Sequence, residues 1–303
     1  MYNEISANKS RTFLLIFIFL VLVIAVGWAL SNILGRPWIL PFAIVFSVFQ
    51  ALISYYYSDS IALGIARAHE APREEYIELH RLMENIAITA GLPKPKIYVI
   101  EDNSPNAFAT GRDPNHASLA VTTGLLGLLN KTELEGVVAH EMSHIGNYDI
   151  RLMTVVVVLV GTVVLISDLF LRWSIWGGRG RSNNREGGQI QMLLAIVAIV
   201  LIVLSPIFAT LIQLAISRRR EYLADASGAL LTRFPEGLAS ALEKLGRDRH
   251  PLEAANKAMA HMYIADPMKL DNNGRGGWLA NLFNTHPPIR ERIKKLREMI
   301  PGG

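Results

Sequence analysis

Residues 140–144 read His-Glu-Met-Ser-His, which is an H-E-x-x-H motif. On an α-helix, side chains four positions apart share one face, so His140 and His144 can bind one ion while Glu141 faces the water beside it. Zinc hydrolases use this arrangement, because zinc lowers the pKa of a water molecule to about 7 and the glutamate accepts its proton. The motif also arises by chance in roughly one per cent of chains this long, so its surroundings must support it.

The residues before the motif predict that it lies on a helix. Thr132 and Glu135 form a capping-box pattern, with Thr132 as the N-cap and Glu135 reaching back to it. We therefore expect a helix that begins at Thr132 and carries both histidines.

A catalytic zinc site needs a third protein ligand and an open position for water. Glu221 and Asp225 are four positions apart, just after three arginines. By themselves they are better explained as an ordinary helical acid pair that balances the arginines. Beside an H-E-x-x-H motif without a third ligand, we expect Glu221 to bind the metal and Asp225 to accept the free N–H of a ligating histidine.

The composition is that of a membrane protein. Of 303 residues, 51% are hydrophobic and only 18% are charged, with a mean hydropathy of +0.28. Each of four apolar stretches approaches or exceeds the roughly 20 residues that cross a bilayer core. These stretches are Phe13–Leu34, Trp38–Tyr57, Leu152–Leu171 and Ile190–Ile216. The first two predict a transmembrane hairpin, whereas the last two are also compatible with buried helices of a soluble core.

Basic residues at the ends of the four stretches place both soluble segments on the cytoplasmic side. These residues are Lys9, Arg11, Arg67, Arg73, Arg151 and Arg218–Arg220. The loop Arg172–Gly188 disagrees, because it carries four arginines on the opposite side. Either the charge rule is overruled there, or the last two stretches do not both span the membrane.

Charge and cysteine content exclude several other classes. The net charge of +4 and the pI near 9.3 would suit nucleic acid, but no aromatic platform or recognition helix accompanies the basic residues, so we expect no nucleic-acid partner. The absence of cysteine excludes thiolate ligands and cysteine nucleophiles.

The predicted fold class is α+β and mainly helical, with a small sheet. A helix over Pro72–Ala90 should end at Gly91, and short strands are expected at Lys96–Ile100, Ala107–Thr110 and Ser118–Thr122. The strand Ala107–Thr110 is a candidate edge for pairing with an extended peptide, unless it is a core strand with a covered edge. Four parts are expected: a hairpin (1–57), a first catalytic half (58–151), a second hydrophobic pair (152–216) and a second catalytic half (217–303).

Together these features resemble the HtpX-type membrane-bound zinc metalloproteases, whose relatives include the CaaX prenyl endopeptidases. The resemblance follows the whole chain in order: the apolar hairpin, Ser104–Gly111, His140–His144, Arg218–Asp225 with its R-x-x-E-x-x-x-D order, and Thr285–Pro288. It implies a zincin-like catalytic domain and one zinc ion bound by His140, His144 and Glu221, with Glu141 as general base and acid.

The resemblance also implies that Asn106 and His286 lie beside the substrate and stabilise the oxyanion. Without it, Asn106 is equally well explained by a turn after Pro105, and His286 by a helix that begins at the following prolines. It further implies a protease in the cytoplasmic membrane that acts on unfolded or damaged membrane proteins. Two alternatives remain: a processing enzyme for lipidated C-terminal motifs, and a non-catalytic scaffold in which zinc ties the two soluble halves together.

Overall fold

The computed structural model describes residues 2–159, 161–162, 218–248, 250, 252, 259, 262–265 and 287–299. Most of the second hydrophobic pair, the loop Arg172–Gly188 and His286 lie outside these residues. The predictions made for them therefore remain predictions.

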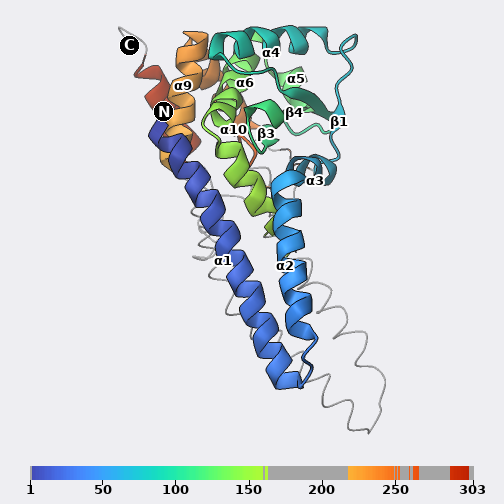
Figure 1. Ribbon diagram of the computed structural model, residues 1–303. Helices are drawn as coiled ribbons and strands as arrows, with labels where there is room; N and C mark the ends of the chain where they lie inside the picture. The colour runs from blue at the N-terminus through green and yellow to red at the C-terminus, as the bar shows by residue number, and fades with distance from the viewer. Residues whose placement is uncertain are drawn as a thin grey trace.

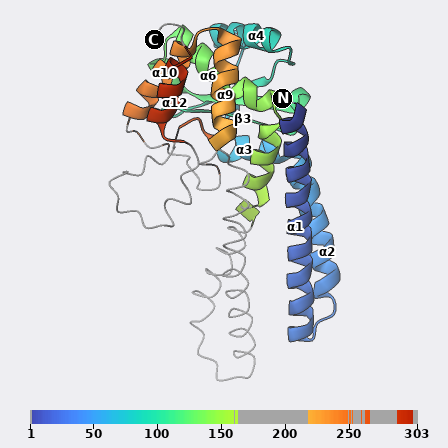
Figure 2. The same ribbon diagram turned by 90° about the vertical axis from the view of Figure 1, so that its left-hand side faces the viewer.

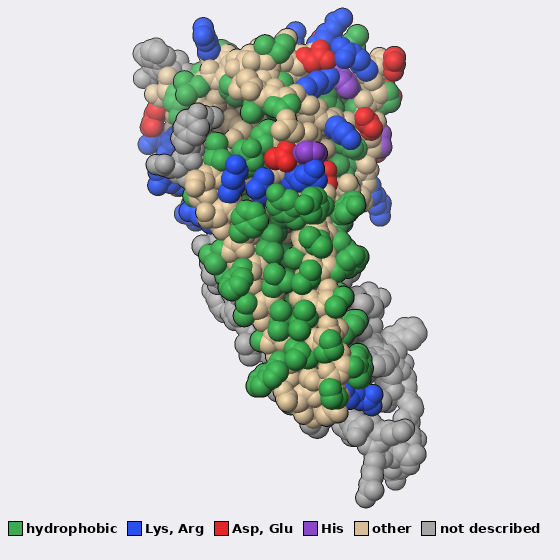
Figure 3. Space-filling model, viewed as in Figure 1, with side chains coloured by type: hydrophobic (Ala, Val, Ile, Leu, Met, Phe, Trp, Pro, Cys, Tyr) green, Lys and Arg blue, Asp and Glu red, His purple; other side chains and the backbone are tan. Residues whose placement is uncertain are grey.

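Two long helices at the start of the chain project from the rest of the protein. Helix α1 (Tyr2–Leu34) and helix α2 (Ile39–Tyr56) lie side by side in both views (Figures 1 and 2). Both are long and apolar enough to cross a membrane, and only 17% and 22% of the residues in their most apolar stretches are buried. Figure 3 shows the resulting hydrophobic surface along the pair. A helix of a soluble core would instead be mostly buried.

Basic and aromatic side chains meet where this pair joins the remainder of the protein. Lys9 lies over the ring of Tyr148, and Arg151 lies over the rings of both Tyr55 and Tyr148. Lysines and arginines lie directly beside the hydrophobic surface at this end (Figure 3). Amphipathic aromatic rings and basic groups are the residues that favour a membrane–water boundary.

A small mixed sheet follows the short helix α3 (Ser58–Ile65). Its strands are β1 (His69–Glu70), β2 (Lys96–Ile100), β3 (Ala107–Gly111) and β4 (Ala117–Thr122), in the order β1-β2-β4-β3. Strands β2 and β4 are parallel, and β3 pairs with β4 antiparallel. The three predicted strands are confirmed, and β3 is an edge strand. The two-residue β1 was not predicted, because so short a strand has no periodicity.

Helix α4 (Ile77–Ala90) confirms the helix predicted before Gly91, which adopts the left-handed conformation with φ of 65°. Helix α5 (Thr123–Leu128) follows β4. Helix α6 (Lys131–Gly146) then runs through the centre of the protein and carries the H-E-x-x-H motif, as predicted. Apolar residues of β4, α4 and α6 share one core, which explains why nearly all of the second half of α6 is buried.

The N-cap of α6 differs from the prediction. Asn130, not Thr132, accepts a hydrogen bond from the Glu133 backbone, and the Glu133 carboxylate accepts one from the Asn130 backbone. Two residue pairs, Asn130 with Glu133 and Thr132 with Glu135, have the spacing of a capping box, and they are offset by two residues. Lys244 of helix α10 (Pro235–Arg247) lies 2.7 Å from the Glu133 carboxylate, and this tertiary ion pair favours the earlier cap.

Further along the described chain lie α9 (Arg218–Thr232), α10 (Pro235–Arg247) and α12 (Ile289–Arg297). Both α9 and α10 pack on α6, and α12 packs on α10 (Figure 2). Segments separated by more than seventy residues thus surround one helix. Residues 149–159, at the start of the third apolar stretch, are helical and buried.

Candidate metal centre

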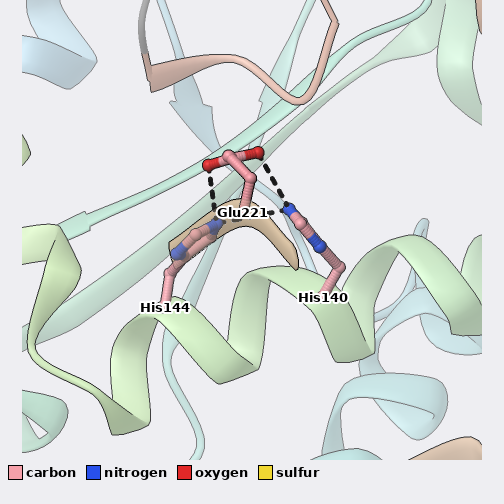
Figure 4. A group of neighbouring side chains, drawn as sticks. All are labelled: His140, His144 and Glu221. Atoms are coloured by element: carbon pink, nitrogen blue, oxygen red, sulfur yellow. Dashed lines mark hydrogen bonds and ion pairs between the residues drawn. The ribbon is translucent and has the colours of Figure 1, made fainter. Parts of the chain in front are cut away.

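Three side chains from two helices converge on one point in the interior. His140 and His144 extend from α6 toward Glu221 of α9 (Figure 4). The two histidine Nε2 atoms are 3.2 Å apart, and the Glu221 carboxylate oxygens lie 3.9 Å from His140 Nε2 and 3.5 Å from His144 Nε2. All three residues are buried, with exposed fractions of 1%, 4% and 2%. The structure places Glu221 beside both histidines, and its role as the third metal ligand stays a prediction.

These separations fit a tetrahedral divalent ion. Zinc bonds of about 2.0–2.1 Å place two ligand atoms roughly 3.3 Å apart. The three ligand atoms lie within 4.8 Å of one another, so small side-chain adjustments suffice. The donor set of two imidazoles and one carboxylate also leaves a fourth position for water, as in catalytic zinc sites.

The backbones of α6 and α9 approach closely at Gly228, which makes this convergence possible. A Cβ atom at Gly228 would lie 3.0 Å from the His140 backbone nitrogen and 3.2 Å from His140 Cα. Glycine therefore sets the distance between the helix that carries the histidines and the helix that carries Glu221.

His140 is oriented through its second ring nitrogen. His140 Nδ1 lies 3.0 Å from Asp225 Oδ1, as expected from the sequence. Two nitrogens of Arg292, in α12, donate to the same carboxylate at 2.9 and 2.7 Å. Burial by itself would raise the pKa of Asp225, but the Arg292 and His140 interactions outweigh it and lower the pKa to about 2. Asp225 is thus a carboxylate that favours an N–H on Nδ1 and leaves Nε2 as the acceptor atom, with Arg292 Nη2 at 3.4 Å from it.

His144 has an equivalent partner that sequence analysis missed. Its Nδ1 lies 2.9 Å from the Asp149 carboxylate, five residues later. Burial would lower the pKa of His144, but Asp149, Glu221 and Glu141 outweigh it and raise the pKa to about 9. With both Nδ1 atoms next to carboxylates, both Nε2 atoms face Glu221, and a metal ion that displaces the His144 proton would be bound by all three groups.

Glu141 lies beside this cluster and is 2% exposed. Burial raises its pKa above the ordinary value, while the neighbouring histidines and the backbone of Ala109 oppose the shift. The Ala109 hydrogen bond places the carboxylate against the edge strand β3. Glu141 therefore lies between the metal ligands and the edge where a peptide could pair.

Asn106 is completely buried at the start of β3. Its side-chain amide donates to the Ala265 carbonyl at 3.0 Å and accepts from the Ala265 backbone nitrogen at 3.3 Å. Arg292 donates to the carbonyl of neighbouring Ile264 at 3.2 Å. In this structure the Asn106 side chain hydrogen-bonds residue 265 and so holds residues 264–265 against the sheet. The expected contact of Asn106 with the oxyanion stays a prediction, as does the role of His286.

Two important site residues carried little sequence signal. Asp149 follows the end of α6, where an acid is as easily explained by solvent exposure, and Arg292 lies in a helix rich in basic residues. Burial would have identified both, because Arg292 is 0% and Asp149 is 1% exposed. Their role depends on where distant segments meet.

Comparison with known proteins agrees with this geometry. Residues 73–300 match the model of "Peptidase family M48". The chain belongs to peptidase family M48. It is 43% identical to a "Protease HtpX homolog" of Caldanaerobacter subterraneus subsp. tengcongensis, with 99% of this chain and 98% of the relative aligned. It is 45% identical to one of Tropheryma whipplei (strain Twist), over the same shares of the two chains.

This M48 peptidase also shares its fold with a solved structure. The crystal structure of S. mikatae Ste24p aligns with a TM-score of 0.50 at 20% identity, covering 98% of this chain and 67% of that one. The family match and the relatives at 43% and 45% identity confirm the expected HtpX-type family. The protein is a metalloprotease, and its relatives together with α1 and α2 support a membrane metalloprotease.

Proposed function

We propose that the protein is a zinc endopeptidase that cleaves misfolded or damaged membrane proteins at the cytoplasmic face of the membrane. The observation that carries the proposal is the convergence of His140, His144 and Glu221 with Glu141 beside them. A purely structural zinc site needs four protein ligands and no base, whereas this cluster offers three ligands and a buried carboxylate.

When bound, zinc supplies Lewis acidity that polarises the scissile carbonyl and acidifies the attacking water. Glu141 takes the proton from that water and passes it to the leaving amine. Burial raises the pKa of Glu141, which is the direction that favours a carboxyl group that both accepts and donates a proton. Asp225 and Asp149 hold the two imidazoles, and Asn106 and His286 are the candidate donors to the oxyanion.

The edge strand β3 is the proposed binding surface for the substrate backbone. The Ala107 carbonyl accepts from Ile264 N at 3.0 Å and the Ala109 backbone bonds Glu141, so alternate residues direct their backbone groups away from β4. A peptide paired beside Ala109 would pass directly next to Glu141. A strand edge pairs only with an extended chain, which favours unfolded substrates over folded surfaces.

The proposed orientation in the membrane is supported by the charged residues. Lys9, Arg112 and Arg151 lie against tyrosine rings where the helix pair meets the catalytic part. We propose that α1 and α2 form a transmembrane hairpin and that this basic end faces the cytoplasm. A cysteine introduced near residue 75 should then be labelled by a membrane-impermeant maleimide only after the cells are opened.

The test compares detergent-purified wild type, Glu141→Gln and His144→Ala in cleavage of a fluorescently labelled unfolded protein. We expect Glu141→Gln to bind zinc normally and cleave 10²–10⁴-fold more slowly, the usual contribution of a general base. His144→Ala should lose both zinc and activity. A chelator should abolish wild-type cleavage, and added zinc should restore it.

The alternatives predict other results. Cleavage only of prenylated peptides would favour a processing enzyme for lipidated C-terminal motifs. Zinc binding with no cleavage of either substrate would favour a scaffold. Full activity of Glu141→Gln would refute the role given to Glu141.

A further inference from the structure

A buried amide of the first long helix reaches the surroundings of the metal centre. Asn8 of α1 is 0% exposed. Its Nδ2 donates to the Asn147 carbonyl at 3.0 Å and to Asp149 Oδ1 at 2.6 Å. Its Oδ1 accepts from Arg220 Nη1 of α9 at 3.2 Å. One side chain thus links α1 to the end of α6 and to the start of α9.

Asp149 divides its two oxygens between this link and the metal centre. Asp149 Oδ2 lies 2.9 Å from His144 Nδ1, while Oδ1 receives Asn8 and lies 3.5 Å from Arg220 Nε. Contacts on Oδ1 restrict rotation of the carboxylate plane. The direction of Oδ2, and hence of the His144 ring, is set partly by Asn8.

We propose that Asn8 is a positioning residue through which the first membrane helix controls the geometry of the metal centre. A shift of α1 relative to α6 would withdraw the Asn8 N–H from Asp149 and free the carboxylate that orients His144. The inference rests on the proposed role of His144 as a metal ligand. It adds that the membrane helices take part in the site as well as anchoring the protein.

If Asn8 only held α1 against the catalytic part, the experiment would give a different result. Removing such a contact would lower the folding stability but leave the orientation of the His144 ring unchanged. A positioning residue changes metal affinity and ligand geometry, and its effect passes through Asp149. Thr12 offers a matched control, because it is also buried on α1 and its hydroxyl donates to the Asn8 carbonyl at 2.8 Å within the same helix.

The experiment uses the full chain in detergent, with Asn8→Ala, Thr12→Val, Asp149→Ala and the Asn8→Ala/Asp149→Ala double variant. Zinc affinity is measured by competition with a chromogenic chelator, and cobalt absorption bands report the ligand geometry. Loss of a direct partner of a ligating histidine costs 10- to 100-fold in affinity. We expect about 3- to 10-fold for Asn8→Ala, which is one contact further away, with shifted cobalt bands. Thr12→Val should change the affinity less than twofold.

The Asn8→Ala/Asp149→Ala double variant tests whether Asn8 affects the metal centre through Asp149. If Asn8 acts through Asp149, Asn8→Ala should have no further effect in the Asp149→Ala background. An equal effect in both backgrounds, or an unchanged affinity and cobalt spectrum in Asn8→Ala, would overturn the proposal. His144→Ala separates the two hypotheses: if it keeps full zinc affinity, the metal assignment fails, whereas normal zinc binding by Asn8→Ala alone rejects only the coupling.

If Asn8→Ala does not fold, the proposal can still be tested by exchanging the amide and the carboxylate between positions 8 and 149. Asn8→Asp places a carboxylate against Asp149 and should weaken zinc binding. Adding Asp149→Asn restores an N–H···O pair with donor and acceptor exchanged, and leaves the new amide oxygen for His144. Recovery of zinc affinity in the exchanged variant supports the proposal, and the absence of any recovery refutes it.

Discussion

Replacing Gly228 by alanine should damage the metal centre although no candidate ligand is replaced. The new Cβ would lie 3.0 Å from His140 N, 3.2 Å from His140 Cα and 3.3 Å from the Ala139 carbonyl carbon, where ordinary contacts are 3.4–4 Å. All three atoms belong to the backbone of α6, so no side-chain rotation can relieve the contact. The helices α6 and α9 must separate by a few tenths of an ångström.

That displacement exceeds what the site tolerates. Metal–ligand distances are held within about 0.2 Å, and Glu221 lies on the same helix as Gly228, roughly two turns earlier. We expect zinc affinity to fall about tenfold or more, which corresponds to roughly 1.4 kcal/mol. The steric overlap should lower the free energy of unfolding by about 1–3 kcal/mol. The higher helix propensity of alanine should raise it by about 1 kcal/mol, so the metal-free protein should be only slightly destabilised.

The assay is chelator competition for zinc affinity, with thermal unfolding of the metal-free protein in parallel. Gly127→Ala is the matched control, since a Cβ there has no heavy atom within 4 Å. If Gly228→Ala binds zinc within twofold of wild type and cleaves substrate normally, the close approach of the two helices does not set the ligand spacing and the reasoning is wrong.

Three further predictions concern pH, a buried ion pair and a helix cap. Because the pKa of His144 is raised to about 9 in the metal-free protein, zinc must displace its proton. The apparent zinc affinity should therefore rise about tenfold per pH unit up to pH 9 and then level off. Calorimetry below that pH should show the release of one proton for each zinc ion bound. Arg292→Leu leaves Asp225 buried without its cation and should cost about 3–5 kcal/mol in denaturant unfolding, and a loss below 1 kcal/mol would contradict the pairing. Asn130→Ala removes the cap of α6 and should cost about 1 kcal/mol with zinc affinity nearly unchanged, whereas Thr132→Ala should cost less.

Local sequence patterns predicted the helices that carry the candidate metal ligands. The spacing of His140 and His144 gives them a shared face on any helix, and the need for a third ligand pointed to Glu221, with Asp225 one turn later as the histidine partner. The cap of α6 was misplaced by two residues because the same short pattern occurs at Asn130 and at Thr132. A distant residue, Lys244, favours the first.

Sequence alone was enough to predict the candidate chemistry: two imidazoles one helical turn apart with Glu141 between them, a carboxylate at Glu221, and apolar stretches long enough for a membrane. Apart from Asp225, the polar groups around these residues could be found only once the fold was known. Asp149 lies beyond the end of the helix that carries His144, while Arg292 and Asn8 contact residues far along the chain. Periodicity and spacing report neighbours within one helix or strand. The partners of a buried polar group are set by how the helices pack, and local patterns do not contain that information.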